Sequence, residues 1–86
     1  MNEISCEYIK ATLATIWFNV LGVDPVENDS NYFELGGDSM AAVLILNDIY
    51  KLFNIKMLLE EFSLYRTFGA QVENIVNKTK SKPCAT

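Results

Sequence analysis

The chain has 86 residues, which is enough for one small domain with its own hydrophobic core. Half of the residues are hydrophobic and 21% are charged, a balance typical of a folded globular domain rather than of a disordered chain. The formal net charge of −4 argues against a nucleic acid as the main partner, because binding to phosphate backbones needs clustered Lys and Arg.

The first helix is predicted over residues 3–21. Gly22 then acts as a helix stop, and Pro25 prevents easy continuation. Apolar residues recur in the helix at steps of three and four, as one buried face requires: Ile4, Tyr8, Ile9, Leu13, Ile16, Trp17, Val20 and Leu21.

Residues 23–38 show no periodicity and are rich in turn-forming residues, so they are predicted to form a loop. Loops of this length are usually functional or disordered. Here an ordered loop is favoured, because four apolar side chains can anchor it to the core: Val26, Tyr32, Phe33 and Leu35.

The second helix is predicted over residues 39–53, with Asp38 as its N-cap. Its buried face is expected to hold Ala42, Ile45, Leu46, Ile49, Leu52 and Phe53. Met40, Val43 and Leu44 lie on the opposite face and would form an apolar patch beside Ser39. The alternative is that this helix is buried on more of its circumference.

Two further helices complete the prediction. Residues 58–62 can form one or two turns, and the last helix runs from its N-cap Thr67 to about Lys78. The buried stripe of the last helix is expected to hold Phe68, Val72, Ile75 and Val76. The expected fold class is all-α: a four-helix bundle of three longer helices and one short third helix, with a long ordered first loop.

We expect a monomeric domain over residues 1–80 and a flexible tail over residues 81–86. The sequence shows no signal peptide and no apolar run of membrane-spanning length, so no membrane association and a cytoplasmic location are expected. Cys6 and Cys84 are then expected to be reduced, with a disulfide between the two ends as the alternative. Two cysteines without histidine do not make an ordinary zinc site.

The string "LGGDSMAA", residues 35–42, raises the question of what Ser39 does. The chain has no histidine, so a Ser-His-Asp triad is excluded. No strand precedes the serine, no glycine follows it and no lysine adjoins it, which excludes a nucleophile elbow and a P-loop. Glu60 and Glu61 could be read as a pair of catalytic carboxylates, but adjacent residues on a helix point apart. They are therefore interpreted as part of a solvated helix face. A catalytic site is therefore not expected.

Two interpretations of Ser39 remain from the residues alone. At the N-terminus of a helix, free N–H groups and the helix dipole favour an anion, so Ser39 is suited to receive a phosphate-linked group. Alternatively, Gly36, Gly37 and Asp38 form only a turn and a cap, and Ser39 is an ordinary residue of the first turn.

The segment "NYFELGGDSMAAVLILNDIYKLF" resembles the core of carrier proteins that bear 4′-phosphopantetheine. It is most similar to the peptidyl (thiolation) carrier domains of nonribosomal peptide synthetases. Their signature is an aromatic-rich stretch followed by Leu-Gly-Gly, His or Asp, and Ser, which Tyr32, Phe33 and residues 35–39 match in order. The similarity extends over about residues 4–78, and the fold of the family is a four-helix bundle with a long first loop.

The resemblance implies that Ser39, with Gly37 and Asp38 beside it, is the attachment site of a 4′-phosphopantetheine arm that a phosphopantetheinyl transferase transfers from coenzyme A. The thiol of the arm would hold an aminoacyl or peptidyl group as a thioester. Met40, Val43 and Leu44 would form the docking surface for adenylation, condensation, thioesterase or tailoring enzymes.

The sequence departs from the family pattern in one place, because Arg66-Thr67 stands where a Pro-Thr pair is frequent. Residues 40–46 carry no charge, which disfavours a fatty-acid carrier and leaves a polyketide carrier as the nearer alternative. Two alternatives to a carrier function remain. The first is a helical module that binds a partner protein without a covalent arm, and the second, which the residues favour least, is a small hydrolase that uses Ser39.

Overall fold

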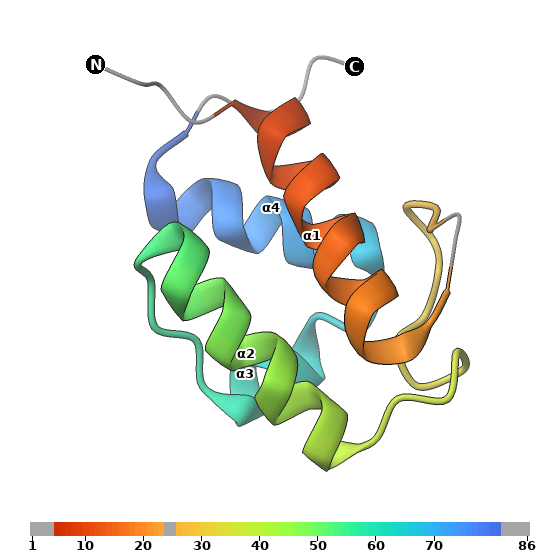
Figure 1. The fold of residues 1–86 in the computed structure, drawn as a ribbon. Helices are drawn as coiled ribbons and strands as arrows, with labels where there is room; N and C mark the ends of the chain where they lie inside the picture. Colours follow the sequence, from red (N-terminus) through yellow and green to blue (C-terminus); the bar gives the residue numbers. More distant parts are fainter. Residues whose placement is uncertain (1–4, 24–25, 82–86) are drawn as a thin grey trace.

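The structure, a computed structural model, describes residues 5–23 and 26–81 (Figure 1). This part of the chain forms four helices: α1 (Cys6–Leu21), α2 (Ser39–Phe53), α3 (Leu59–Leu64) and α4 (Phe68–Thr79). Helix α1 packs against α2 and α4, and α2 packs against α3. The all-α class, with three longer helices and a short third one, is confirmed.

Local signals in the sequence explain where the helices begin and end. The Ser5 hydroxyl accepts the Tyr8 N–H at 3.2 Å and caps α1, which begins three residues later than predicted. Gly22 ends α1 in the left-handed conformation, as predicted. Helix α2 has the predicted bounds, and Asn54 ends it with a φ of 57°. The predicted helical residue Ile4 lies outside the described residues.

The core lies between the helices and the first loop. Its buried members come from every helix and include two residues outside the helices, Tyr32 in the first loop and Met57 in the connection between α2 and α3. The predicted stripe of α4 is buried throughout, and α4 also buries two polar residues that the sequence reading missed, Gln71 and Asn74.

Three residues predicted to be buried are exposed. Tyr8 and Leu52 line a groove between α1 and α2, and their exposed fractions are 50% and 53%. The ring of Tyr8 lies edge-on to Phe53 at the margin of the bundle, where one side of the ring faces solvent. Phe33 is 45% exposed because its ring covers Tyr32 from outside.

The expectation of reduced cysteines is wrong for Cys6, which is disulfide-bonded. That expectation depended on the cellular compartment, which local sequence patterns do not encode. The prediction for Cys84 lies outside the described residues. Of the predicted tail, Ser81 lies just beyond α4, and its N–H donates to the Val76 carbonyl at 3.0 Å. Residues 82–86 lie outside the described residues.

The described helices were also compared with the length and hydropathy of a membrane span. None of those in residues 5–23 and 26–81 combines the length and the apolar character that a bilayer crossing requires.

Candidate functional site

Asp38 is the N-cap of α2, and Ser39 is the first residue of the helix. The Asp38 Oδ1 accepts the N–H of Ala41 at 2.9 Å, and the Asp38 backbone carbonyl accepts the N–H of Ala42 at 2.9 Å. The extended backbone of Asp38, with a φ of −129°, suits an N-cap. The predicted cap is therefore confirmed, and it fixes the direction in which α2 leaves the loop.

The loop reaches Asp38 through a tight turn. The Asn31 side chain accepts the N–H groups of Phe33 and Glu34 at 2.9 and 3.2 Å, which holds the start of the turn. Gly36 then adopts a φ of 94°, a conformation that side-chain-bearing residues rarely adopt. The two glycines of the motif differ in role, because Gly37 is constrained by a neighbouring ring rather than by its φ.

That neighbouring ring belongs to Tyr32. Its hydroxyl donates a hydrogen bond of 2.6 Å to the Asp38 backbone carbonyl, and its own carbonyl accepts the Gly37 N–H at 3.1 Å. A Cβ on Gly37 would overlap with the Tyr32 ring. Gly37 is therefore required for the close approach between the loop and this ring.

The surroundings of Tyr32 keep its hydroxyl protonated. Burial raises the pKa of Tyr32, the Asp38 carboxylate raises it further, and the hydrogen bond to the Asp38 carbonyl opposes both. A phenol with a raised pKa remains a hydrogen-bond donor at neutral pH. The sequence reading identified Tyr32 as an apolar anchor and missed the function of its hydroxyl.

An aromatic cluster fixes the Tyr32 ring. Its centroid lies 4.8 Å from that of Phe62, 5.1 Å from that of Phe33 and 5.8 Å from that of Trp17, each at a near-perpendicular angle. Edge-to-face pairs of this kind add stability beyond the burial of apolar area. Since Trp17 is on α1 and Phe62 on α3, the ring holds the loop to two helices.

The loop also joins the start of α4. Phe68 and Gly69 donate their N–H groups to the carbonyls of Ser30 and Asn28, each at 2.9 Å. The next free amide, that of Ala70, donates to the predicted N-cap Thr67 at 3.2 Å. The first amides of α4 are therefore all satisfied by protein oxygens.

The start of α2 differs from the start of α4. Within the described residues, the N–H groups of Ser39 and Met40 donate to no protein acceptor. Both residues are exposed, and the Ser39 hydroxyl makes no hydrogen bond within this part of the chain. Two free amides beside an exposed hydroxyl, at the positive end of a helix dipole, provide a favourable environment for an anion.

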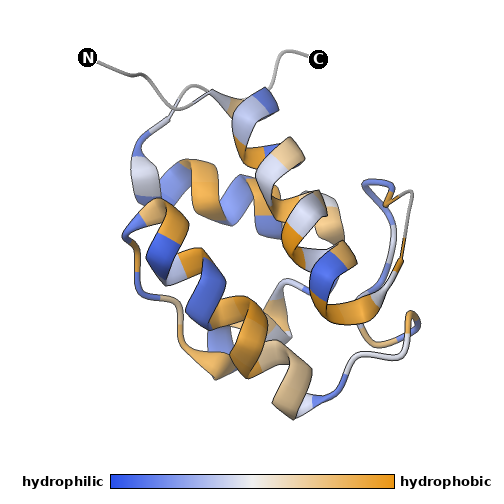
Figure 2. Ribbon diagram, in the orientation of Figure 1, coloured by the Kyte–Doolittle hydropathy of each residue, from blue (hydrophilic) through white to orange (hydrophobic). Residues whose placement is uncertain are grey.

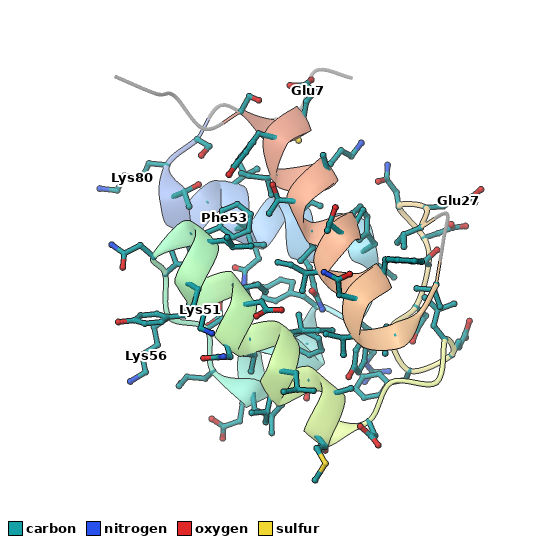
Figure 3. The ribbon with its side chains drawn as sticks, viewed as in Figure 1. Glu7, Glu27, Lys51, Phe53, Lys56 and Lys80 are labelled. Atoms are coloured by element: carbon teal, nitrogen blue, oxygen red, sulfur yellow. The ribbon has the colours of Figure 1, made fainter. Side chains whose placement is uncertain are left out.

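The nearest lysine on α2 is too distant to activate Ser39. Lys51 follows Ser39 by twelve positions, which corresponds to about 18 Å along the helix axis. Figure 3 shows Lys51 and Lys56 near the far part of α2, away from its start. Lys78, on α4, forms a salt bridge of 3.0 Å with Glu61, on α3. Glu61 is therefore paired and partly exposed, whereas Glu60 is exposed as a solvated face requires.

An apolar patch adjoins Ser39, as predicted. Met40 is 78% exposed, Val43 53% and Leu44 54%, so the alternative of a more deeply buried helix is wrong. Figure 2 shows apolar colouring along this first part of α2. Helix α3, which packs against α2, adds exposed leucines that the sequence reading did not single out: Leu59 within the helix, Leu58 before it and Leu64 at its end.

Comparison of the sequence with known proteins identifies a family that matches most of the chain. Residues 11–75 match the family described as "Phosphopantetheine attachment site". The chain is 33% identical over 72 residues to bacitracin synthase 1 of Bacillus licheniformis and 35% identical over 72 residues to gramicidin S synthase 2 of Brevibacillus brevis. Each match covers 84% of this chain and only 1% or 2% of the relative, so the chain corresponds to a small part of these synthases.

Solved structures share the fold. The solution structure of an active-site mutant peptidyl carrier protein superimposes with a TM-score of 0.80 over 99% of this chain and 96% of that one, at 19% identity. The carrier in McyG A-PCP, complexed with phenylalanyl-adenylate, gives a TM-score of 0.76 at 28% identity, over 86% of this chain and 12% of that one. The chain therefore belongs to the phosphopantetheine attachment site family of carrier domains, whose prosthetic group is a covalent 4′-phosphopantetheine.

Proposed function

We propose that Ser39 bears the 4′-phosphopantetheine arm and that the chain carries aminoacyl or peptidyl thioesters between enzymes of nonribosomal peptide biosynthesis. The observation that carries this proposal is the exposed Ser39 hydroxyl at the start of α2, within the part of the chain that matches the family. The peptide class is supported by the relatives, which are synthases of peptide products.

The residues around Ser39 suit a phosphate-linked group. The free amides of Ser39 and Met40 would donate to the phosphate oxygens, and the helix dipole would stabilise their negative charge. The Asp38 carboxylate is engaged by the Ala41 amide, which holds the cap in place. When bound, the arm supplies a thiol that forms the thioester, so the chain itself needs no nucleophile beyond the modified serine.

The apolar patch of Met40, Val43 and Leu44 supplies a contact surface beside the modified serine. We infer that a phosphopantetheinyl transferase uses this surface first, and that adenylation, condensation, thioesterase or tailoring enzymes use it afterwards. Two solved neighbours support this inference by what they contain. One is the transferase Sfp in complex with coenzyme A and a peptidyl carrier protein, and the other is McyG A-PCP complexed with phenylalanyl-adenylate. In this proposal the chemistry belongs to the partners, and the chain acts as a carrier rather than as an enzyme.

The test is intact-protein mass before and after incubation with coenzyme A and a broad-specificity phosphopantetheinyl transferase. The parent should gain one phosphopantetheine and Ser39→Ala should gain none. Ser63→Ala, which alters another exposed serine, is the matched control and should be modified like the parent. An unmodified but folded parent would overturn the proposal, and so would modification of Ser39→Ala.

A further inference from the structure

Tyr32 connects three parts of the chain at the base of the candidate site. Its N–H donates to the Arg66 carbonyl at 2.8 Å, which joins it to the segment between α3 and α4. Its carbonyl accepts the Gly37 N–H at 3.1 Å, and its hydroxyl donates to the Asp38 carbonyl at 2.6 Å. One fully buried residue therefore holds the two residues that precede Ser39.

The bond to Asp38 has a direct consequence for Ser39. The Asp38 carbonyl and the Ser39 N–H belong to the same peptide group, which is planar and in which the two bonds point in opposite directions. The Asp38 carbonyl accepts both the Tyr32 hydroxyl and the Ala42 N–H, so its direction is set from two sides. The direction of the free Ser39 amide is set at the same time.

We propose that the Tyr32 hydroxyl is a positioning group for the modification of Ser39: it orients the peptide group that leads into the serine and so presents the hydroxyl and amide of Ser39 to the transferase. This inference rests on the proposed function of Ser39. It goes beyond that function because it assigns a role in the reaction to a single buried oxygen atom of a different residue.

The aromatic ring and the hydroxyl of Tyr32 can be separated experimentally. The ring is held by Trp17, Phe33 and Phe62, and the backbone of Tyr32 by two hydrogen bonds, so neither depends on the hydroxyl. Tyr32→Phe therefore keeps the packing and removes only the bond to Asp38. Tyr50→Phe, on an exposed face of α2, is the matched control.

The first measurement is the rate of Ser39 modification by the transferase with coenzyme A, followed by intact mass with kcat and KM determined separately. We expect kcat to fall about five- to tenfold in Tyr32→Phe, the loss that corresponds to one hydrogen bond. The KM for the carrier should be unchanged because the patch of Met40, Val43 and Leu44 is intact, and Tyr50→Phe should match the parent in both constants. An unchanged kcat in Tyr32→Phe, or a change confined to KM, would overturn the role of Tyr32.

A second measurement does not need the transferase. The NMR order parameter of the Ser39 amide reports its motion on the picosecond to nanosecond timescale. It should fall in Tyr32→Phe and stay at the parent value in Tyr50→Phe, and equal values in all three proteins would overturn the inference. If the parent is not modified at all, the proposed function fails, while the order parameters still decide whether Tyr32 orients this peptide group.

Discussion

The side chain of Asn74, on α4, donates a hydrogen bond of 2.7 Å to Oε2 of Glu61, on α3. The Nζ of Lys78, one turn further along α4, lies 3.0 Å from the same oxygen. Helix α3 has six residues and no side-chain N-cap, so it has little stability of its own. Glu61 therefore fixes a short helix that packs against α2 and carries exposed leucines.

The charge of Glu61 should make α3 sensitive to acid. Burial acts to raise the pKa of Glu61, but the bonds to Asn74 and Lys78 outweigh it, so the pKa lies below its ordinary value of 4.5. A lowered pKa contributes stability that is present above 4.5 and is lost as the pH falls through the pKa of the folded state. In urea unfolding between pH 7 and about pH 3, Glu61→Gln should lose less stability on acidification than the parent. Glu60→Gln, on the neighbouring exposed residue, should behave like the parent, and identical acid sensitivity of all three would contradict the interpretation.

Gly37→Ala should destabilise the domain by about 1–3 kcal/mol, because the new methyl group overlaps with the Tyr32 ring and that ring is fixed by its aromatic neighbours. Gly36→Ala is the control for backbone strain alone. It has open space for a methyl group but a φ of 94°, so it should lose only about 1 kcal/mol. Urea unfolding measures both losses. Equal losses would show that the Tyr32 ring moves aside without cost.

Asp38→Ala should lower the free energy of unfolding by about 1 kcal/mol, since the Ala41 amide loses the carboxylate that caps it. Asp38→Asn keeps an oxygen at the same position and should retain most of the stability. Thermal unfolding followed by circular dichroism distinguishes the two variants. If Asn proved as destabilising as Ala, the charge rather than the hydrogen bond would be the source of the stability.

Val43→Asp should weaken the docking of the transferase. A carboxylate in the middle of an apolar contact raises the KM for the carrier by about tenfold or more, the factor that corresponds to about 1.4 kcal/mol. Leu52→Asp is closely matched, because Leu52 is on the same helix and both side chains are 53% exposed, but Leu52 lies at the far end from Ser39. Both variants should keep parental stability within about 0.5 kcal/mol. A similar rise in KM for Leu52→Asp would mean that added charge, and not the patch, governs docking.

The features that the sequence predicted well depend on neighbouring residues. The bounds of α2 and the caps Asp38 and Thr67 follow from signals within a few positions, and both caps form the expected bonds. The features that it missed depend on how the segments are arranged in space. The salt bridge between Glu61 and Lys78 forms only because the fold brings α3 and α4 together. The hydrogen bond from the Tyr32 hydroxyl to the Asp38 carbonyl forms only because the turn at Gly36 brings the two residues together. Periodicity alone also placed Leu52 on the buried face, although the edge of the bundle leaves it exposed.

The bonds between the loop and α4 determine how the site region can move. Opening the loop would expose the Tyr32 ring and deprive Phe68 and Gly69 of their acceptors, so the loop cannot detach without fraying the start of α4. Hydrogen exchange at the amides of Tyr32, Phe68 and Gly69 is therefore expected to require the same opening as exchange in the core, unlike the fast exchange typical of surface loops. Under the proposed function, the base of an arm on Ser39 would therefore stay rigid, and the serine would reach partner enzymes by displacement of the whole domain rather than of the loop.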